Sequence, residues 1–360
     1  MNPWGLLGHE RAVRAFQGAH RAGRLGHAYL ITGVPGSGRR TFAARMAQAL
    51  RCSAPDRPCR ACRLCRAVEP DAPFWQSAVR RAHPDEVDDP RPPRDRRDAG
   101  YIHTAYLDVH VLRRRDGFRD IPIRGVRELA AETYLKPAHG PARVAIIDAA
   151  EELSIPAANA LLKTLEEPAP HAVIILIAQQ ASGVLPTLRS RCHHMALAPV
   201  PETQIASHLV AERGLEAEAA DAIAAAARGR AGWAIGMARD ESRWREFAER
   251  QAKAQAFEGA APAARFMLVD ELLGRGRPLE QAERAYQWLA HINRAQASEL
   301  RAAMRAAGSG APTEARAALR SVVARMLRAR DAQVHIQHNV TPKLVFEDLA
   351  LRPAADSRPR

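Results

Sequence analysis

The clearest pattern along the chain is a set of short apolar runs separated by segments of helical periodicity. Apolar positions three and four residues apart predict an amphipathic helix over Glu10 to Ala22. The nearly continuous apolar runs predict buried strands of the parallel-sheet type, at residues 27–31, 143–149 and 172–178. Because these strands alternate with helical segments, we expect a doubly wound α/β domain with its ligands at the carboxyl ends of the strands.

The pattern changes in two places. From Pro201 onward the strand signals fade, and two helical blocks follow, a short one to about Asp240 and a longer one from about Trp244 to Leu351. Residues 71–120 are instead rich in Pro, Arg and Asp, a composition that buries too little apolar surface to order itself fully. We therefore predict a partly mobile insertion there, inside the α/β domain.

The first predicted strand runs into a glycine-rich loop, GVPGSGRRT, and a helix over residues 42–51 follows. This order of strand, loop and helix is the setting of a phosphate-binding loop, in which backbone N–H groups close around phosphate oxygens. A nucleotide hydrolase also needs a Lys and then a Ser or Thr that holds Mg²⁺, and this chain has Arg39 and Arg40 at those positions. We predict a phosphate cradle that has lost its metal-holding hydroxyl.

Asp148 ends the second strand, where a P-loop protein needs a carboxylate to order Mg²⁺. The next residue is Ala149, whereas a hydrolase of this type has a Glu that polarises water. Capping of the next helix is an equally good reading of Asp148. We expect at most weak, Mg²⁺-independent nucleotide binding. The residues assigned to this degenerate nucleotide site are Gly33, Gly36, Gly38, Arg39, Arg40, Thr41 and Asp148.

Four cysteines lie within fourteen positions, in the spacing C-x6-C-x2-C-x2-C. Such short spacings let thiolates converge on one ion, so we predict a structural zinc site with a closed coordination sphere. A redox pair is the main alternative. The predicted zinc ligands are Cys52, Cys59, Cys62 and Cys65, and the distant Cys192 is expected to be a small core residue.

Composition adds two expectations. The 360 residues are 47% hydrophobic, and no apolar run approaches the length of a membrane span, so we expect a cytoplasmic protein without a membrane partner. The net charge of +13 suits nucleic-acid binding. However, the chain has only four lysines, so the excess is almost all Arg and is equally well explained by a coding bias.

Several segments together resemble the clamp-loader subunits of bacterial DNA polymerase III. They include GHERAVRAF, RLGHAYLITG, the glycine loop, the cysteines and Asp148. The most specific are NALLKTLEEP at 159–168 and LPTLRSRC at 185–192, and the resemblance extends to Asn339, Pro342, Leu344 and Glu347 near the C-terminus. Within the family the chain is most similar to the delta-prime type.

The resemblance implies an AAA+ domain over residues 1–198 with a zinc module at 52–65, a helical lid at 199–243, and a helical collar at 244–352 that assembles subunits. Residues 353–360 would form a disordered tail. In this family, delta-prime is a stator in a five-membered ring with gamma or tau and delta subunits. The ring places the sliding clamp on primed DNA. By resemblance, Arg191 in the SRC tripeptide is the arginine finger for a neighbouring ATPase site.

Three departures favour the delta-prime type over the ATPase type. These are the two arginines in the glycine loop, Ala149, and Gly232, which stands where ATPase subunits have a nucleotide-sensing Arg. Two alternatives stay open at this level. One is an active gamma or tau type ATPase that tolerates Arg39, and the other is a zinc-bearing nucleic-acid-binding protein with an AAA+ shell.

Overall fold

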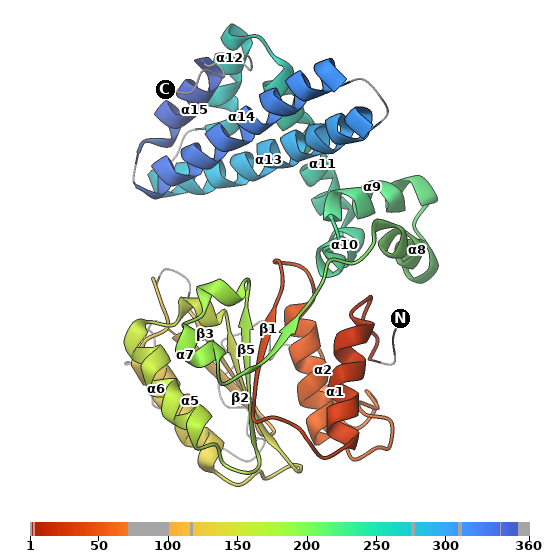
Figure 1. Ribbon diagram of the computed structural model, residues 1–360, viewed down its shortest axis with the longest axis vertical. Helices are drawn as coiled ribbons and strands as arrows, with labels where there is room; N and C mark the ends of the chain where they lie inside the picture. Colours follow the sequence, from red (N-terminus) through yellow and green to blue (C-terminus); the bar gives the residue numbers. More distant parts are fainter. Residues whose placement is uncertain are drawn as a thin grey trace. The chain divides into compact units, whose positions relative to one another are not determined.

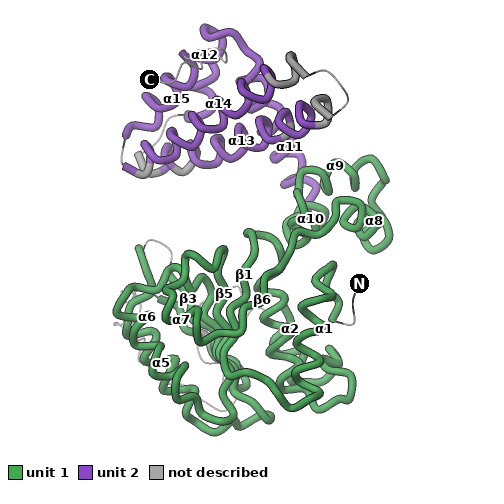
Figure 2. The backbone as a smooth tube through the Cα atoms, in the orientation of Figure 1, with its two compact units in different colours: residues 1–239 green, residues 240–360 purple. Residues whose placement is uncertain are grey.

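The computed structural model describes residues 2, 4–70, 101–115, 118–274, 278–308, 312–338 and 340–351. The chain divides into two compact units, residues 1–239 and 240–360 (Figure 2). The predicted tail at 353–360 and most of the predicted insertion at 71–120 lie outside the described residues.

Unit 1 is built on one six-stranded sheet with the order β2-β3-β4-β5-β1-β6. Its pairings are parallel except for the antiparallel hairpin of β2 and β3. The strands are β1 (Ala28–Thr32), β2 (Tyr101–Tyr106), β3 (Val109–Arg114), β4 (Arg143–Asp148), β5 (Ala172–Ala178) and β6 (His193–Ala196). The three predicted strands are therefore the three adjacent central ones.

Helices cover both faces of this sheet, which is why β1, β4 and β5 are buried along their whole length (Figure 1). Successive side chains point to opposite faces, so Ile31 packs in the cluster with Phe16 and Phe42, while Leu30 packs in the cluster with Leu161. The helices of the first face are α1 (Glu10–Arg21) and α2 (Arg39–Arg51). Those of the second face are α5 (Ile123–Tyr134), α6 (Ile155–Glu166) and α7 (Pro186–Arg189).

Strands β2, β3 and β6 are not predicted by the sequence pattern. The first two lie within the stretch 71–120, whose described part is thus an ordered hairpin at the edge of the sheet. Val109 and Leu112 of this hairpin are fully buried. Strand β6, with the sequence HHMA, is largely exposed at the other edge. Neither strand of the hairpin has a long apolar run, and β6 has none, so only pairing with a neighbour makes them strands.

Unit 1 also contains the short helix α3 (Arg63–Ala67), which follows α2 and carries Cys65, and the helices α8 (Glu202–Arg213), α9 (Ala217–Ala227) and α10 (Ala231–Ala238) after the sheet. The turn between α9 and α10 is tied to the chain leaving the sheet by a hydrogen bond from the N–H of Val200 to the carbonyl oxygen of Gly229, 2.9 Å long. A Cβ atom at Gly229 would lie 2.5 Å from the Cβ atom of Pro199, so the chain approaches itself too closely there for another residue type.

Unit 2 is entirely helical in its described part. Its helices are α11 (Glu241–Gly259), α12 (Pro262–Leu273), α13 (Pro278–Gly308), α14 (Pro312–Gln337) and α15 (Pro342–Leu351). Phe257, Leu289 and Phe346, from three different helices, meet in its core. No described helix of either unit is long and apolar enough to cross a membrane. The coarse expectation of a flanked α/β sheet and a helical C-terminal part is therefore confirmed.

Candidate functional site

The glycine loop lies where the sequence predicts it, between β1 and α2. Gly36 and Gly38 have φ angles of 83° and 95°, in the region that favours glycine, and Gly38 is the N-cap of α2. Arg39, Arg40 and Thr41 form the first turn of that helix. The backbone therefore has the form of a phosphate cradle at a helix N-terminus.

Arg40 and Asp148 meet at the carboxyl end of the sheet. The Nε atom of Arg40 lies 2.6 Å from Oδ2 of Asp148, whose side chain is 9% exposed while that of Arg40 is 62% exposed. The carboxylate that would order Mg²⁺ in a nucleotide hydrolase thus already has a cation from its own chain. Burial lowers the pKa of Arg39, against the opposing effects of the nearby Glu151 and Asp148 carboxylates. In this arrangement the Asp148 carboxylate is paired with Arg40 and lies near Arg39.

The acidic residues that follow Asp148 are also engaged. Ala149 has a φ angle of 65° and turns the chain into a short 3₁₀ helix, Ala150–Glu152. Oε1 of Glu151 accepts a hydrogen bond from the N–H of Gln179, 3.0 Å long, and Glu152 pairs with Nε of Arg114 at 2.9 Å. Each of these carboxylates thus has a bonding partner within the chain. A hollow of about 260 Å³ remains beside them, lined by Arg40, Ile102, Arg113, Arg114, Asp148, Ala149 and Glu152.

Helix α10 closes over the glycine loop. The N–H of Trp233 donates a hydrogen bond of 3.1 Å to the carbonyl oxygen of Gly36. A Cβ atom at Gly36 would lie 2.9 Å from the Cβ atom of Trp233, and a Cβ atom at Gly232 would lie 3.1 Å from the Gly36 oxygen. The Arg230 guanidinium stacks on the Trp233 ring at 4.8 Å. Gly232 stands out in the sequence, but Trp233 does not, because only the fold brings α10 to the loop.

Arg191 lies at the surface after α7. Its guanidinium donates to the carbonyl oxygen of Thr187 at 3.0 Å and pairs with Oε1 of Glu166 at 2.6 Å, and its side chain is 38% exposed. Glu166 belongs to the NALLKTLEEP segment, so the two most specific segments of the resemblance contact one another here. Thr187 and Glu166 are thus partners of the Arg191 guanidinium at the surface.

The four predicted metal ligands come together. Their sulfur atoms all lie within 4.8 Å of one another, as four thiolates around one tetrahedral zinc require. The backbone N–H groups of Cys62 and Ala61 lower the pKa of Cys59 to about 6. The buried Arg51 lies beside the cluster. Burial lowers the pKa of Arg51, and the nearby Cys65 and Cys62 sulfurs offset part of this lowering. This donor set fits zinc.

Cys192 takes no part in that cluster. It is half-buried and packs against the apolar cluster under α5 and α6, and burial raises its pKa to about 11. It is therefore the small packing residue that the sequence predicts.

With this geometry in view, the comparisons with known proteins identify the family. The model of the family described as "DNA polymerase III, delta subunit" matches residues 8–201, more than half of the chain. The chain belongs to this family. The match covers the glycine loop, the cysteines, Asp148 and Arg191, but not unit 2.

Individual relatives are of two types. A DNA polymerase III subunit delta' from Pseudomonas aeruginosa is 30% identical over 197 residues, which are 55% of this chain and 50% of the relative. A DNA polymerase III subunit gamma/tau from Mycobacterium bovis is 30% identical over 198 residues, 54% of this chain and 28% of the relative. The matches thus span half or less of these relatives.

A solved structure of a gamma subunit-related protein from Thermotoga maritima matches with 14% identity and a TM-score of 0.38. The match covers 93% of this chain and 97% of that protein. A likeness this low carries no argument about the site.

Proposed function

We propose that this chain is a delta-prime type subunit of a bacterial DNA polymerase III clamp loader, a stator that does not hydrolyse ATP itself. The observation that carries this proposal is the Arg40–Asp148 pair. A hydrolase needs that carboxylate for Mg²⁺, which bridges the phosphates and neutralises the charge of the transition state. With a guanidinium bonded to the carboxylate and no Glu at position 149, this chain lacks two parts of the reaction.

The positions of Arg191 and Cys52 to Cys65 support the rest of the proposal. Arg191 is the finger offered to the ATP site of a neighbouring gamma or tau subunit, and Glu166 keeps it oriented while no neighbour is bound. An Arg brought to a transferring phosphoryl group stabilises the charge that develops there. Zinc would hold the loop between α2 and the next helix, with no open position for a substrate.

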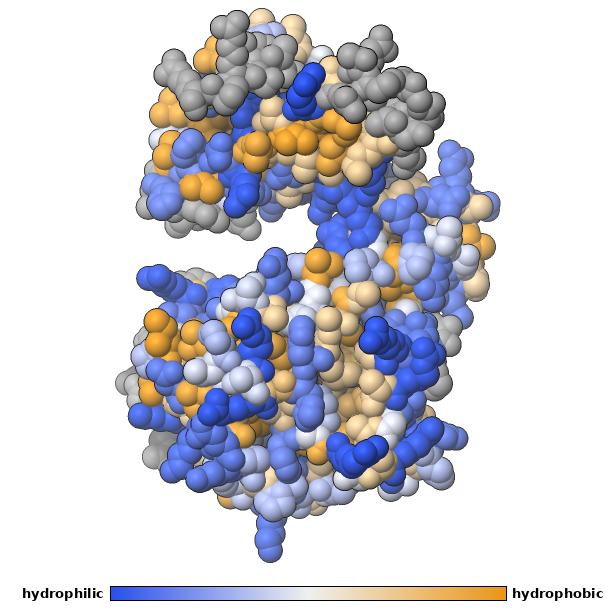
Figure 3. Space-filling view, in the orientation of Figure 1, coloured by the Kyte–Doolittle hydropathy of each residue, from blue (hydrophilic) through white to orange (hydrophobic). Residues whose placement is uncertain are grey.

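Unit 2 would act as the collar through which the subunits of a five-membered ring assemble, with gamma or tau and delta as partners. Its surface carries apolar side chains suited to burial against another subunit (Figure 3). The exposed ones on its helices include Met267, Met304, Val323, Leu327, Val334 and Leu344. The complete ring would open the sliding clamp and load it on primed DNA. Helices α8 to α10 would form the lid.

The decisive experiment compares the purified chain with the reconstituted loader. The chain alone should hydrolyse no ATP. In the loader carrying Arg191→Ala, the DNA-stimulated turnover at the one neighbouring site that receives this Arg should fall by roughly 10³-fold, and the total ATPase activity should fall by that site's share. Arg189→Ala, which removes an exposed Arg two residues away, is the matched control and should leave the activity unchanged. Both variants must first be shown by gel filtration to assemble. Full activity of the assembled Arg191→Ala loader would reject the finger assignment.

The second candidate is an active gamma or tau type ATPase, which the gamma/tau relative from Mycobacterium bovis favours because it is as similar as the delta' relative. Turnover of ATP by the isolated chain, abolished by Asp148→Asn, would establish this candidate and reject the stator.

A further inference from the structure

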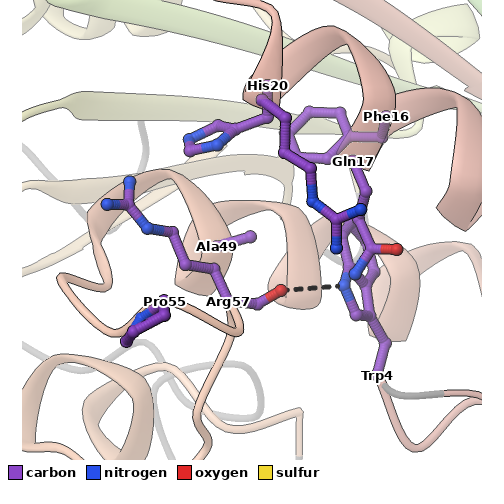
Figure 4. A pocket seen from close by; sticks show the side chains of 8 residues that line it. Trp4, Phe16, Gln17, His20, Ala49, Pro55 and Arg57 are labelled. Atoms are coloured by element: carbon purple, nitrogen blue, oxygen red, sulfur yellow. Dashed lines mark hydrogen bonds between the residues drawn. The ribbon is translucent and has the colours of Figure 1, made fainter.

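A second hollow lies at the other end of α2 from the glycine loop. It has a volume of about 290 Å³ and opens between α1 and the loop that leads from α2 into the cysteine cluster (Figure 4). Ala49, at its edge, is ten residues along the helix from Arg39, so about 15 Å separates the two sites. The residues that line the hollow are Trp4, Phe16, Gln17, His20, Arg21, Ala49, Pro55 and Arg57.

The walls of this hollow are fixed. The indole N–H of Trp4 donates to the carbonyl oxygen of Arg57 at 3.2 Å, as Figure 4 shows, and Nε of Arg57 donates to the carbonyl oxygen of Ala54 at 2.9 Å. The Trp4 ring lies edge-on to Phe16, with centroids 5.5 Å apart, and both side chains are buried. The loop at 54–57 is thus anchored to the core, and a ligand would meet a formed surface.

The lining is positively charged. Arg21 and Arg57 come from different elements, Gln17 adds an amide, and none of the eight lining residues is acidic. No hydrogen bond or ion pair within the described residues engages the Arg21 guanidinium. The pKa of His20 is lowered mainly by burial and to a smaller extent by the positive charge of Arg57. The Arg57 charge therefore acts on groups inside the hollow.

We propose that this hollow binds the phosphate group of a nucleotide, either free or within a single strand of nucleic acid. Guanidinium groups offer paired N–H donors that match phosphate oxygens. Gln17 and His20 also line the hollow and carry polar groups that would bond the remaining oxygens. The volume is at the lower end for small-molecule sites, roughly 300 to 1,000 Å³, so it admits a phosphate with part of the group that carries it. None of the lining residues is a zinc ligand or a residue of the nucleotide site, but Pro55 and Arg57 lie in the loop between the ligands Cys52 and Cys59.

The test titrates the full-length chain with pyrophosphate and, separately, with a single-stranded oligothymidylate, by calorimetry. The variant Arg21→Gln/Arg57→Gln keeps the backbone bond to Trp4 and should bind at least tenfold more weakly. Arg11→Gln, an exposed Arg of the same helix that lies outside the hollow, is the matched control and should bind as the unchanged chain does. Preference for pyrophosphate identifies a free nucleotide as the ligand, and preference for the oligomer identifies a nucleic-acid strand.

The pKa of His20, measured by NMR, distinguishes binding in the hollow from a general attraction of anions to the basic surface, which would leave this pKa unchanged. An anion bound next to His20 favours its charged form, so saturating pyrophosphate should raise its pKa, and Arg57→Gln should raise it without ligand. The proposal is overturned if the double variant binds both ligands undiminished. It is also overturned if Arg11→Gln weakens binding as much as the double variant does, or if the pKa of His20 is unchanged at saturation.

Discussion

Replacing Arg40 by Thr is the sharpest perturbation of the degenerate nucleotide site. The substitution removes the guanidinium from Asp148 and restores a hydroxyl at the position where a hydrolase holds Mg²⁺. Two opposite effects should follow. The protein becomes less stable without metal, because a buried carboxylate loses its cation. It also gains an affinity for Mg²⁺ that the unchanged chain lacks.

The size of the first effect follows from the exposure of the two partners. A fully exposed ion pair contributes about 0–1 kcal/mol, whereas leaving a buried acceptor without its partner costs about 1–3 kcal/mol. Arg40 is 62% exposed but Asp148 only 9%, and the nearby Arg39 still faces the carboxylate. We therefore expect a loss of about 1–2 kcal/mol. In a unit of this size that lowers the midpoint of thermal unfolding by roughly 2–6 °C.

The gain in Mg²⁺ affinity is measured from the same thermal unfolding curves, recorded with added Mg²⁺. A ligand at ten times its Kd stabilises the folded state by about 1.4 kcal/mol, which would return most of the lost stability to Arg40→Thr. Arg40→Lys keeps a cation and should show neither effect. Arg245→Thr controls for the change from Arg to Thr in a helix, since Arg245 forms an exposed pair with Glu241.

Two results would refute this reasoning. One is equal stabilisation of the unchanged chain and of Arg40→Thr by Mg²⁺, because it would mean that Arg40 does not exclude the ion. The other is an Arg40→Thr protein as stable as the unchanged chain, because it would mean that Asp148 needs no cation.

Three further outcomes are expected. Metal analysis should find one zinc per chain. The variant Cys59→Ser should lose the zinc and with it thermal stability, whereas Cys192→Ser should retain both. Equal zinc content in the two variants would contradict the four-cysteine site. Gly36→Ala should lower the free energy of unfolding by at least about 1–2 kcal/mol, because φ is 83° and the new Cβ would lie 2.9 Å from a Cβ atom of α10. Gly236→Ala has open space in that helix and should stabilise the protein by up to about 1 kcal/mol. If denaturation showed Gly36→Ala to be the more stable of the two variants, the close contact between Gly36 and α10 would be excluded. Burial lowers the pKa of His291 to about 4, so below about pH 6.5 the unfolded chain binds more protons. Stability should then fall between pH 6.5 and 4, by on the order of 2 kcal/mol, and His291→Asn should flatten that dependence in chemical denaturation.

The sequence was sufficient where the backbone geometry depends on neighbours in the chain. The glycine loop, the cysteine cluster and the end of the strand at Asp148 are local patterns, and each local pattern implies its own backbone geometry. The buried strands were also readable, because a strand covered on both faces is apolar at every position. The cap of α6 is a local contact of the same kind, since the Ser154 side chain accepts a hydrogen bond from the N–H of Ala157.

The tertiary structure decided what depends on residues far apart in the chain. The edge strands carry no apolar run and become strands through hydrogen bonds to their neighbours. Trp233 meets the glycine loop about 200 residues away in the chain only because α10 folds back on it. The pairing of Arg40 with Asp148 turns two separate substitutions into one ion pair. A sequence shows which charges are present, but their energies depend on distance and burial, which are set by the fold.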